Sequence, residues 1–183
     1  VIVKHANPCG VSVNNNKILS YKEALSCDPI SAFGGIVSCN FKINKKIALE
    51  LSKIFLEVII GVGFDKDSLK ILKKKKNLRL IDASKIQKNN NDNIIGNFDS
   101  LLFQNLDNKI FTKNNFKVVS KVKPTKKILN DLLFAFNVCR GVKSNAIVLT
   151  RNSSTVGIGS GQPSRLDSCK LAIDKMKKFQ KIN

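Results

Sequence analysis

Short runs of β-branched and other apolar residues alternate with helical apolar patterns along nearly the whole chain, and this alternation constrains the fold most. The sequence predicts strands at residues 1–3, 36–37, 58–60, 78–81, 101–104, 117–122, 146–149 and 155–158. It predicts helices at residues 21–27, 44–56, 68–76 and 126–142, and a last helix that begins after residue 164. Strands that alternate with helices indicate an α/β protein, in which helices flank a mixed or largely parallel sheet.

Several residues mark where the predicted helices begin and end. Ser20 is a candidate N-cap, because Glu23 follows three residues later as in a capping box. Asp67 is expected to cap a helix whose last turn holds lysines 73–76, where positive charge suits the negative end of the helix dipole. Thr125 is expected to begin the strongest helix of the chain.

The two C-terminal helices have amphipathic patterns, and turn residues separate several of the predicted elements. The helix at 126–142 has an apolar stripe formed by Ile128, Leu132, Ala135, Phe136 and Cys139. The last helix is expected to direct Leu166, Cys169, Leu171, Ala172 and Ile173 toward the core. Residues 7–10, the Asn-rich stretch 85–97 and the pair Asn152-Ser153 are predicted to be loops or turns.

The chain has 183 residues, which indicates about one domain. No apolar run approaches the roughly 20 residues of a membrane-spanning helix, and no signal peptide is visible. The only methionine is Met176, so residue 1 is not a natural start and we expect the chain to be an internal piece of a longer protein. The five cysteines have no C-x-x-C spacing and there is one histidine, which argues for buried thiols in a reducing cytosol and against a zinc site.

The net charge of +19 raises the question of a polyanion partner. The positive charge comes from 28 lysines but only 4 arginines, and Lys, Asn and Ile together make 69 of the 183 residues. Because these three residues share A/T-rich codons, the bias fits the genome as well as it fits a function. A nucleic-acid reader usually uses arginine, whose planar fork contacts phosphate and guanine, so a solvated lysine surface is the favoured interpretation.

Four segments could carry chemistry, and each also has a purely structural interpretation. Lys4-His5 lies where a strand opens into a loop, so a proton acceptor and an ammonium group would meet there. The stretch 31–35 ends in two glycines that would let a ligand approach the backbone, or would simply form a tight turn. Asn145 offers a donor and an acceptor before a buried strand. The glycines of 157–165 could hold an anion at a helix N-terminus, or allow close packing of a strand.

These segments, taken together and in order, resemble the transformylase part of the bifunctional family that fuses AICAR formyltransferase to IMP cyclohydrolase. The matching strings are VIVKHANPCG (1–10), DPISAFGGIV (28–37), FLEVIIGVGF (55–64), KKNLRL (75–80), DLLFAFNVCRGVKSNAIVL (131–149) and TVGIGSGQPSR (155–165). Their joint occurrence is specific and covers nearly the whole chain, although the stretch 85–97 contributes little. The resemblance implies a lobe similar to cytidine deaminases, without the deaminase zinc signature.

The resemblance implies that a formyl group passes from 10-formyltetrahydrofolate to the 5-amino group of AICAR ribonucleotide, with no metal in the chemistry. His5 is then the candidate base and Lys4 the candidate group that stabilises the oxyanion. The implied binding residues are Gly34 and Glu57 for the nucleotide, Asn145 for the carboxamide and amine, Arg165 for the substrate and Leu166 for the folate.

The resemblance also sets expectations for the whole assembly. Residues 1–183 would be the first lobe of the transformylase, without the cyclohydrolase domain that precedes it and the lobe that follows it. Members are cytoplasmic homodimers that share active sites, so Lys4 and Asn145 could serve different sites and the fragment alone should have little activity. Gly61-Val62 stands where the family commonly has Ala-Pro, and Pro163 where it has another residue. A basic polyanion-binding module and a purely structural fragment remain the alternative interpretations.

Overall fold

The computed structural model describes residues 1–86, 93–107 and 109–180. The strands are β1 (Ile2–Lys4), β2 (Asn7–Gly10), β3 (Gly35–Ser38), β4 (Leu56–Gly61), β5 (Arg79–Asp82), β6 (Asn93–Asn97), β7 (Ser100–Gln104), β8 (Ile147–Arg151) and β9 (Ser154–Gly159). The helices are α1 (Lys17–Cys27), α2 (Lys45–Leu51), α3 (Lys66–Leu72), the short 3-10 helix η1 (Lys113–Asn115), α4 (Lys126–Cys139) and α5 (Arg165–Phe179). No helix in the described part of the chain is long and apolar enough to cross a membrane.

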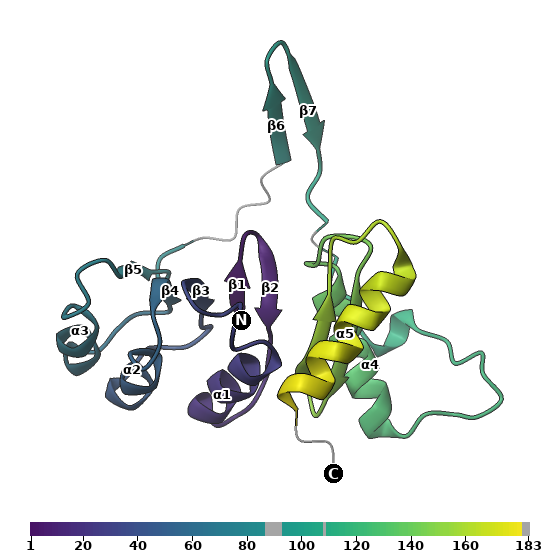
Figure 1. Cartoon of the computed structure of the whole chain (residues 1–183), viewed down its shortest axis with the longest axis horizontal. Coiled ribbons are helices and arrows are strands. Elements are labelled where there is room, and N and C mark those ends of the chain that lie inside the picture. The colour runs from purple at the N-terminus through teal and green to yellow at the C-terminus, as the bar shows by residue number, and fades with distance from the viewer. Residues whose placement is uncertain (87–92, 108, 181–183) are drawn as a thin grey trace.

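A five-stranded mixed sheet with the order β2-β1-β3-β4-β5 forms the N-terminal half. β1 pairs antiparallel with β2 and β3, whereas β4 pairs in parallel with β3 and β5. The helices α1, α2 and α3 lie on the same side of this sheet (Figure 1). Ile2, Val37 and Ile59 lie opposite one another in the register and pack with helix residues such as Ile47 and Leu72, which makes this side the main hydrophobic core.

The other side of the sheet is also apolar, and α1, α2 and α3 do not cover it. Ile36 and Ile81 point away from the core and are 36% and 43% exposed. Successive side chains of a strand point to opposite faces, so residues that face this side alternate with core residues along each strand. The sheet is therefore apolar on both faces, as in strands that are covered on both sides.

The C-terminal part contains the β8–β9 hairpin, with α4 and α5 packed against it. Two glycines of β9 allow α5 to approach closely, because a Cβ on Gly157 would lie 2.2 Å from the carbonyl oxygen of Ala172 and one on Gly159 would lie 1.9 Å from that of Ser168. Of the two interpretations open for the 157–165 stretch, these two glycines thus fit close strand packing.

The five-stranded sheet and the β8–β9 hairpin are joined by strand-like pairing between distant parts of the sequence. The amide of Val13 donates to the carbonyl oxygen of Ser153 at 2.9 Å, and that of Thr155 donates to the carbonyl oxygen of Val11 at 2.8 Å. Beside them, the hydroxyls of Ser12 and Ser154 both donate to a carboxylate oxygen of Glu23 on α1, at 2.9 and 3.0 Å. The β8–β9 hairpin is thereby fixed against the start of the chain.

The β6–β7 hairpin projects away from the rest of the molecule (Figure 1). It carries large apolar side chains on both faces, since the cross-strand pairs Ile94–Phe103 and Ile95–Leu102 follow each other in the register. All four side chains are more than half exposed. A two-stranded hairpin by itself is marginally stable in water.

The structure confirms the α/β class, the mixed sheet and most of the predicted elements. The predicted helices at 21–27, 44–56 and 126–142 correspond to α1, α2 and α4, with shifted ends. Thr125 caps α4 as expected, and its side-chain oxygen accepts from the amide of Ile128. Part of the Asn-rich stretch 85–97 lies outside the described residues, and its end forms β6 rather than a loop.

Several local predictions were wrong, and two of them concern helix ends. Asn16 rather than Ser20 caps α1, because an Asn side chain accepts from amides two and three residues ahead as well as a serine does. Asp65 rather than Asp67 caps α3. The helix ends at Leu72, so lysines 73–76 follow it and are not its last turn.

Other wrong predictions concern strands and faces. Residues 7–10 form β2 instead of a loop, because Asn7 and Gly10 pair with β1. Residues 117–122 form no strand. Leu166 was expected to face the core but is 73% exposed. The predicted helix 126–142 does form as α4, and Ile128, Leu132 and Phe136 of its apolar stripe are 43–55% exposed.

Candidate functional site

The turn between β1 and β2 is a two-residue turn in an uncommon conformation. His5 and Ala6 have φ angles of 50° and 61°, and Lys4 pairs directly with Asn7 across the turn. Positive φ at both central residues is the type I′ geometry that fits the twist of a hairpin, and it is favoured by Asn and Gly. His adopts positive φ more readily than most residues, whereas Ala6 does not favour it, so the strain lies at Ala6. The turn places Lys4 and His5 at its tip.

The ammonium of Lys4 is held by the neighbouring turn between α1 and β3. Its Nζ donates to the carbonyl oxygen of Phe33. The next residue, Gly34, has a φ of 68°, and its amide donates to the carbonyl oxygen of Phe55 at 2.8 Å. A Cβ at Gly34 would lie 3.1 Å from the Lys4 Nζ, so a glycine leaves the space in which the ammonium sits.

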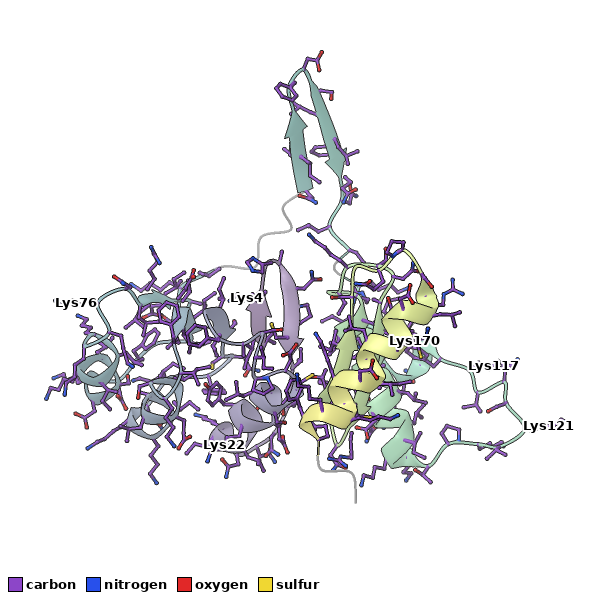
Figure 2. All side chains as sticks on the ribbon, in the orientation of Figure 1. Lys4, Lys22, Lys76, Lys117, Lys121 and Lys170 are labelled. Carbon is purple, nitrogen blue, oxygen red and sulfur yellow. The ribbon has the colours of Figure 1, made fainter. Side chains whose placement is uncertain are left out.

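Lys4 and His5 lie on the wall of a cavity of about 220 Å³ between the hairpin, the turn after α1, β9 and α5. Figure 2 shows Lys4 at the end of β1, close to the junction of the two halves of the molecule. The lining combines cations, one carboxylate and small polar groups, so a polar and anionic molecule would find donors there. The lining residues are Lys4, His5, Asn7, Pro8, Cys9, Asp28, Ser31, Ile158, Ser160 and Lys175.

An ion pair between Asp28 and Lys175 forms part of this lining. The Lys175 Nζ lies 2.8 Å from a carboxylate oxygen of Asp28, whose side chain is 4% exposed. Burial alone would raise the pKa of Asp28, but hydrogen bonds from Lys175 and from the amide and hydroxyl of Ser31 outweigh it and lower the pKa overall. Burial, together with the Asp28 charge, raises the pKa of the Cys9 thiol, which disfavours a reactive thiolate.

Asn145 lies in a loop that packs beside the hairpin. Its side-chain amide donates to the carbonyl oxygens of Gln162 and Pro163 at 3.0 and 2.8 Å. Two residues earlier, the amide of Lys143 donates to the side-chain oxygen of Asn7 at 3.0 Å, which connects this loop to β2. The structure thus brings the Asn145 loop and the 160–163 loop to the same edge as Lys4 and His5, although Asn145 itself does not line the cavity.

The remaining predicted site residues lie at the surface. Glu57 is exposed on β4, two residues after the carbonyl that accepts from Gly34. Arg165 and Leu166 are exposed in the first turn of α5. Among the described residues, neither these three nor Asn145 belongs to the lining of the 220 Å³ cavity.

Sequence reasoning missed two members of this site, Asp28 and Lys175. In the sequence Asp28 stands with Pro29 just after the predicted helix 21–27, and neither its burial nor its cation partner can be read from that position. Lys175 stands in a basic helix beside other lysines, and nothing in its sequence context distinguishes it. No group of three or more His, Cys, Asp or Glu side chains that could hold a metal ion occurs in the part of the chain that the structure describes.

The lysines labelled in Figure 2 are distributed over separate elements. Lys22 lies on α1, Lys76 follows α3, Lys170 lies on α5, and Lys117 and Lys121 lie in the segment between η1 and α4. A nucleic-acid groove would gather such charges on one face or along one helix. These five lysines therefore do not lie along one helix or strand.

Comparison with known proteins gives one consistent family. The model of the AICARFT/IMPCHase bienzyme family matches residues 1–175. Proteins called bifunctional purine biosynthesis protein PurH are 42% identical in Prochlorococcus marinus (strain MIT 9515) and 45% in Persephonella marina, in both cases over 98% of this chain and 35% of the relative. The protein of that name from Buchnera aphidicola subsp. Schizaphis graminum is 46% identical over 97% of this chain and 34% of its own length.

The chain therefore spans about a third of the length of the curated relatives that it matches. The match extends from the β1–β2 hairpin to α5, and so includes every residue that lines the cavity with Lys4 and His5. Because the family model covers far more than half of the sequence, the chain belongs to the AICARFT/IMPCHase bienzyme family.

Proposed function

We propose that the protein transfers the formyl group of 10-formyltetrahydrofolate to the 5-amino group of AICAR ribonucleotide, in purine biosynthesis. The observation that carries this proposal is the pair Lys4-His5 at the tip of the strained β1–β2 turn, on the wall of a polar cavity. Membership of the family supplies the reaction class, and the relatives named as bifunctional purine biosynthesis proteins agree with it. Backbone strain of this kind is concentrated at functional sites.

The chemistry assigns different roles to the two side chains. The amine nitrogen attacks the formyl carbon, a new N–C bond forms, and the bond from the formyl carbon to the folate nitrogen breaks. An aminoimidazole amine is a weak nucleophile, so His5 accepts its proton as the attack proceeds. Negative charge develops on the formyl oxygen, and the Lys4 ammonium stabilises it. The proton accepted from the amine is then transferred to the folate nitrogen as that nitrogen is released.

The proposed binding residues are carried over from the family motifs. Gly34 lies beside the Lys4 ammonium, where a nucleotide could approach the backbone closely. We assign Gly34 and Glu57 to the nucleotide, Asn145 to the carboxamide and amine, Arg165 to the substrate and Leu166 to the folate. The exposure of Glu57, Arg165 and Leu166 in this chain fits residues that meet a ligand or another part of the assembly.

The wider assembly is part of the same proposal. Residues 1–183 would be the first lobe of the transformylase, in a cytoplasmic homodimer whose subunits share active sites and whose other domain closes the ring to IMP. A second lobe would complete the folate site, so we expect the isolated 183 residues to have little or no transferase activity. Turnover by these residues alone at the rate of a full-length relative would contradict this part of the proposal.

The test of the proposed reaction is His5→Ala in the protein as its gene encodes it. Loss of a positioned base lowers kcat by about 10²- to 10⁴-fold, and AICAR binding measured by calorimetry should stay within about threefold. The matched control is Lys170→Ala, which removes an exposed cation from α5 and should leave both quantities unchanged. Turnover that survives His5→Ala would refute the assignment of the base.

A further inference from the structure

The ion pair between Asp28 and Lys175 lies outside the set of residues that the proposed reaction uses, and it needs an explanation. Taking two charges out of water is unfavourable unless further hydrogen bonds satisfy them. Asp28 is 3% exposed and meets this condition, because its carboxylate also accepts from the amide and hydroxyl of Ser31 at 2.9 and 2.7 Å. The Lys175 side chain keeps 28% of its surface exposed, so the buried partner of the pair is the Asp28 carboxylate. Hydrogen bonds around a buried carboxylate favour one arrangement of its surroundings.

This ion pair fixes the 28–35 turn, which holds the Lys4 ammonium. The carbonyl oxygen of Asp28 accepts from the amide of Ala32 at 3.1 Å, and the carbonyl oxygen of Ala32 accepts from the amide of Gly35 at 3.0 Å. Phe33 lies between these two bonds, and its carbonyl oxygen accepts from the Lys4 ammonium. A continuous set of contacts thus runs from Lys175 on α5, through Asp28 and the turn, to the Nζ of Lys4.

We propose that Asp28 and Lys175 are positioning residues, which hold the 28–35 turn and through it the ammonium of Lys4 in the place where it acts. α5 packs against β8, β9 and α1, and Lys175 is the side chain of α5 that reaches the Asp28 carboxylate at the start of this turn. The inference about kcat rests on the proposed function, whereas the inference about the Lys4 ammonium concerns the structure alone.

The first experiment measures the chemical reactivity of each lysine in the protein as its gene encodes it. Brief labelling with a trace of acetic anhydride, read by mass spectrometry, compares wild type with Lys175→Met, which keeps the length of the side chain and removes its charge. We expect the labelling rate of Lys4 to rise about fivefold, the factor that corresponds to the loss of one hydrogen bond of typical net strength. The labelling of exposed Lys22 and Lys170 should not change, which excludes general unfolding as the cause.

The second experiment separates positioning from stability by kinetics. Lys175→Met and Asp28→Asn should each lower kcat by about tenfold to a hundredfold, the size of effect that a displacement of about 1 Å produces, with KM for AICAR within about threefold. Lys175→Arg keeps the charge and should recover most of the rate. The control is Lys177→Met on the same helix, whose exposed side chain does not line the cavity and whose loss should have no effect.

The labelling and the kinetic measurements test different parts of the proposal. If Lys4 labelling stays at the wild-type rate in folded Lys175→Met, the positioning role is wrong, whatever the enzyme does. If labelling rises and the wild-type protein shows no formyl transfer, the positioning role stands and the proposed function fails. A loss of rate in Lys175→Met with unchanged Lys4 labelling would show that Lys175 acts in another way and would overturn the inference.

Discussion

Two hairpins of this protein use the same turn geometry with different residues. The β8–β9 turn has Asn152 and Ser153 at φ angles of 53° and 56°, and the amides of both donate to the carboxylate of Asp131 on α4, at 3.0 and 2.7 Å. The β1–β2 turn has His5 and Ala6 at nearly the same angles, and no described side chain accepts from its amides. Asn tolerates this conformation, whereas Ala has no feature that favours it.

The difference shows where the fold accepts an unfavourable turn. The β8–β9 turn is built for stability, because Asn152 tolerates its conformation and the Asp131 carboxylate accepts from both of its central amides. The β1–β2 turn is held by the pairing of its strands and by contacts of the flanking Lys4 and Asn7 with other segments, and it presents His5 to the cavity. A position where local preference and the observed conformation disagree is where a functional constraint is expected.

Exchanging the turn residues gives the largest expected effect. The double variant His5→Asn, Ala6→Gly installs the sequence that a type I′ turn prefers, so the melting temperature should rise. Formyl transfer should fall by about 10²- to 10⁴-fold, because the base is gone. The matched change Ser153→Gly in the other hairpin creates the same Asn-Gly pair and should leave the rate unchanged. An equal loss of rate in both variants would remove the distinction between the two turns.

The second prediction concerns the acceptor that only the β8–β9 turn has. Asp131→Ala removes two hydrogen bonds to a carboxylate, and we expect the free energy of unfolding to fall by about 3 kcal/mol in urea titrations. Asp174→Ala, an exposed acid on α5, is the control and should change stability by less than about 0.5 kcal/mol. A fall of similar size in both variants would mean that Asp131 does not hold the turn.

The smallest expected effect comes from Ala6→Gly alone. Because Ala6 has a φ of 61°, glycine should relieve the strain and raise the free energy of unfolding by about 1 kcal/mol. The same substitution at Ala83, whose φ is not positive, should lower it through the greater freedom of the unfolded chain. Thermal melts of the two variants should therefore shift in opposite directions, and a shift in the same direction would contradict the strain.

The element pattern was predictable because it depends on local residue spacing. Four of the five strands of the main sheet, β1, β3, β4 and β5, came from apolar periodicity, and the helix that follows Thr125 from a capping residue; both are local signals. The β2 strand was missed because Asn7-Pro8-Cys9-Gly10 has turn residues throughout, and only its pairing with β1 makes it a strand. Residues 117–122 show the reverse case, since a β-branched run forms no strand where no partner strand is available.

The candidate site likewise has one part that local sequence could predict and one part that depends on tertiary packing. Lys4 and His5 could be proposed from the sequence because their neighbourhood in it is distinctive, and the structure places both on the wall of the cavity. Lys175 is brought to Asp28 only by the packing of α5, since the two residues are 147 positions apart in the sequence. The roles of Lys4, His5, Gly34, Glu57, Asn145, Arg165 and Leu166 all stay predictions, as does the similarity of the lobe to cytidine deaminases.

The pairing of residues 11–13 with the start of β9 has a consequence for the order of folding. The hydrogen bonds between Val11 and Thr155 join residues 144 positions apart, so the loop that closes there is almost as long as the chain. Contacts of such sequence separation form slowly, because chain entropy must be lost before they contribute. During synthesis, the β1–β5 sheet leaves the ribosome long before β9 exists. Ser12 and Glu23 therefore cannot bond Ser154 at that stage, and the edge that they line is open until the C-terminal hairpin has been synthesised and has folded against it.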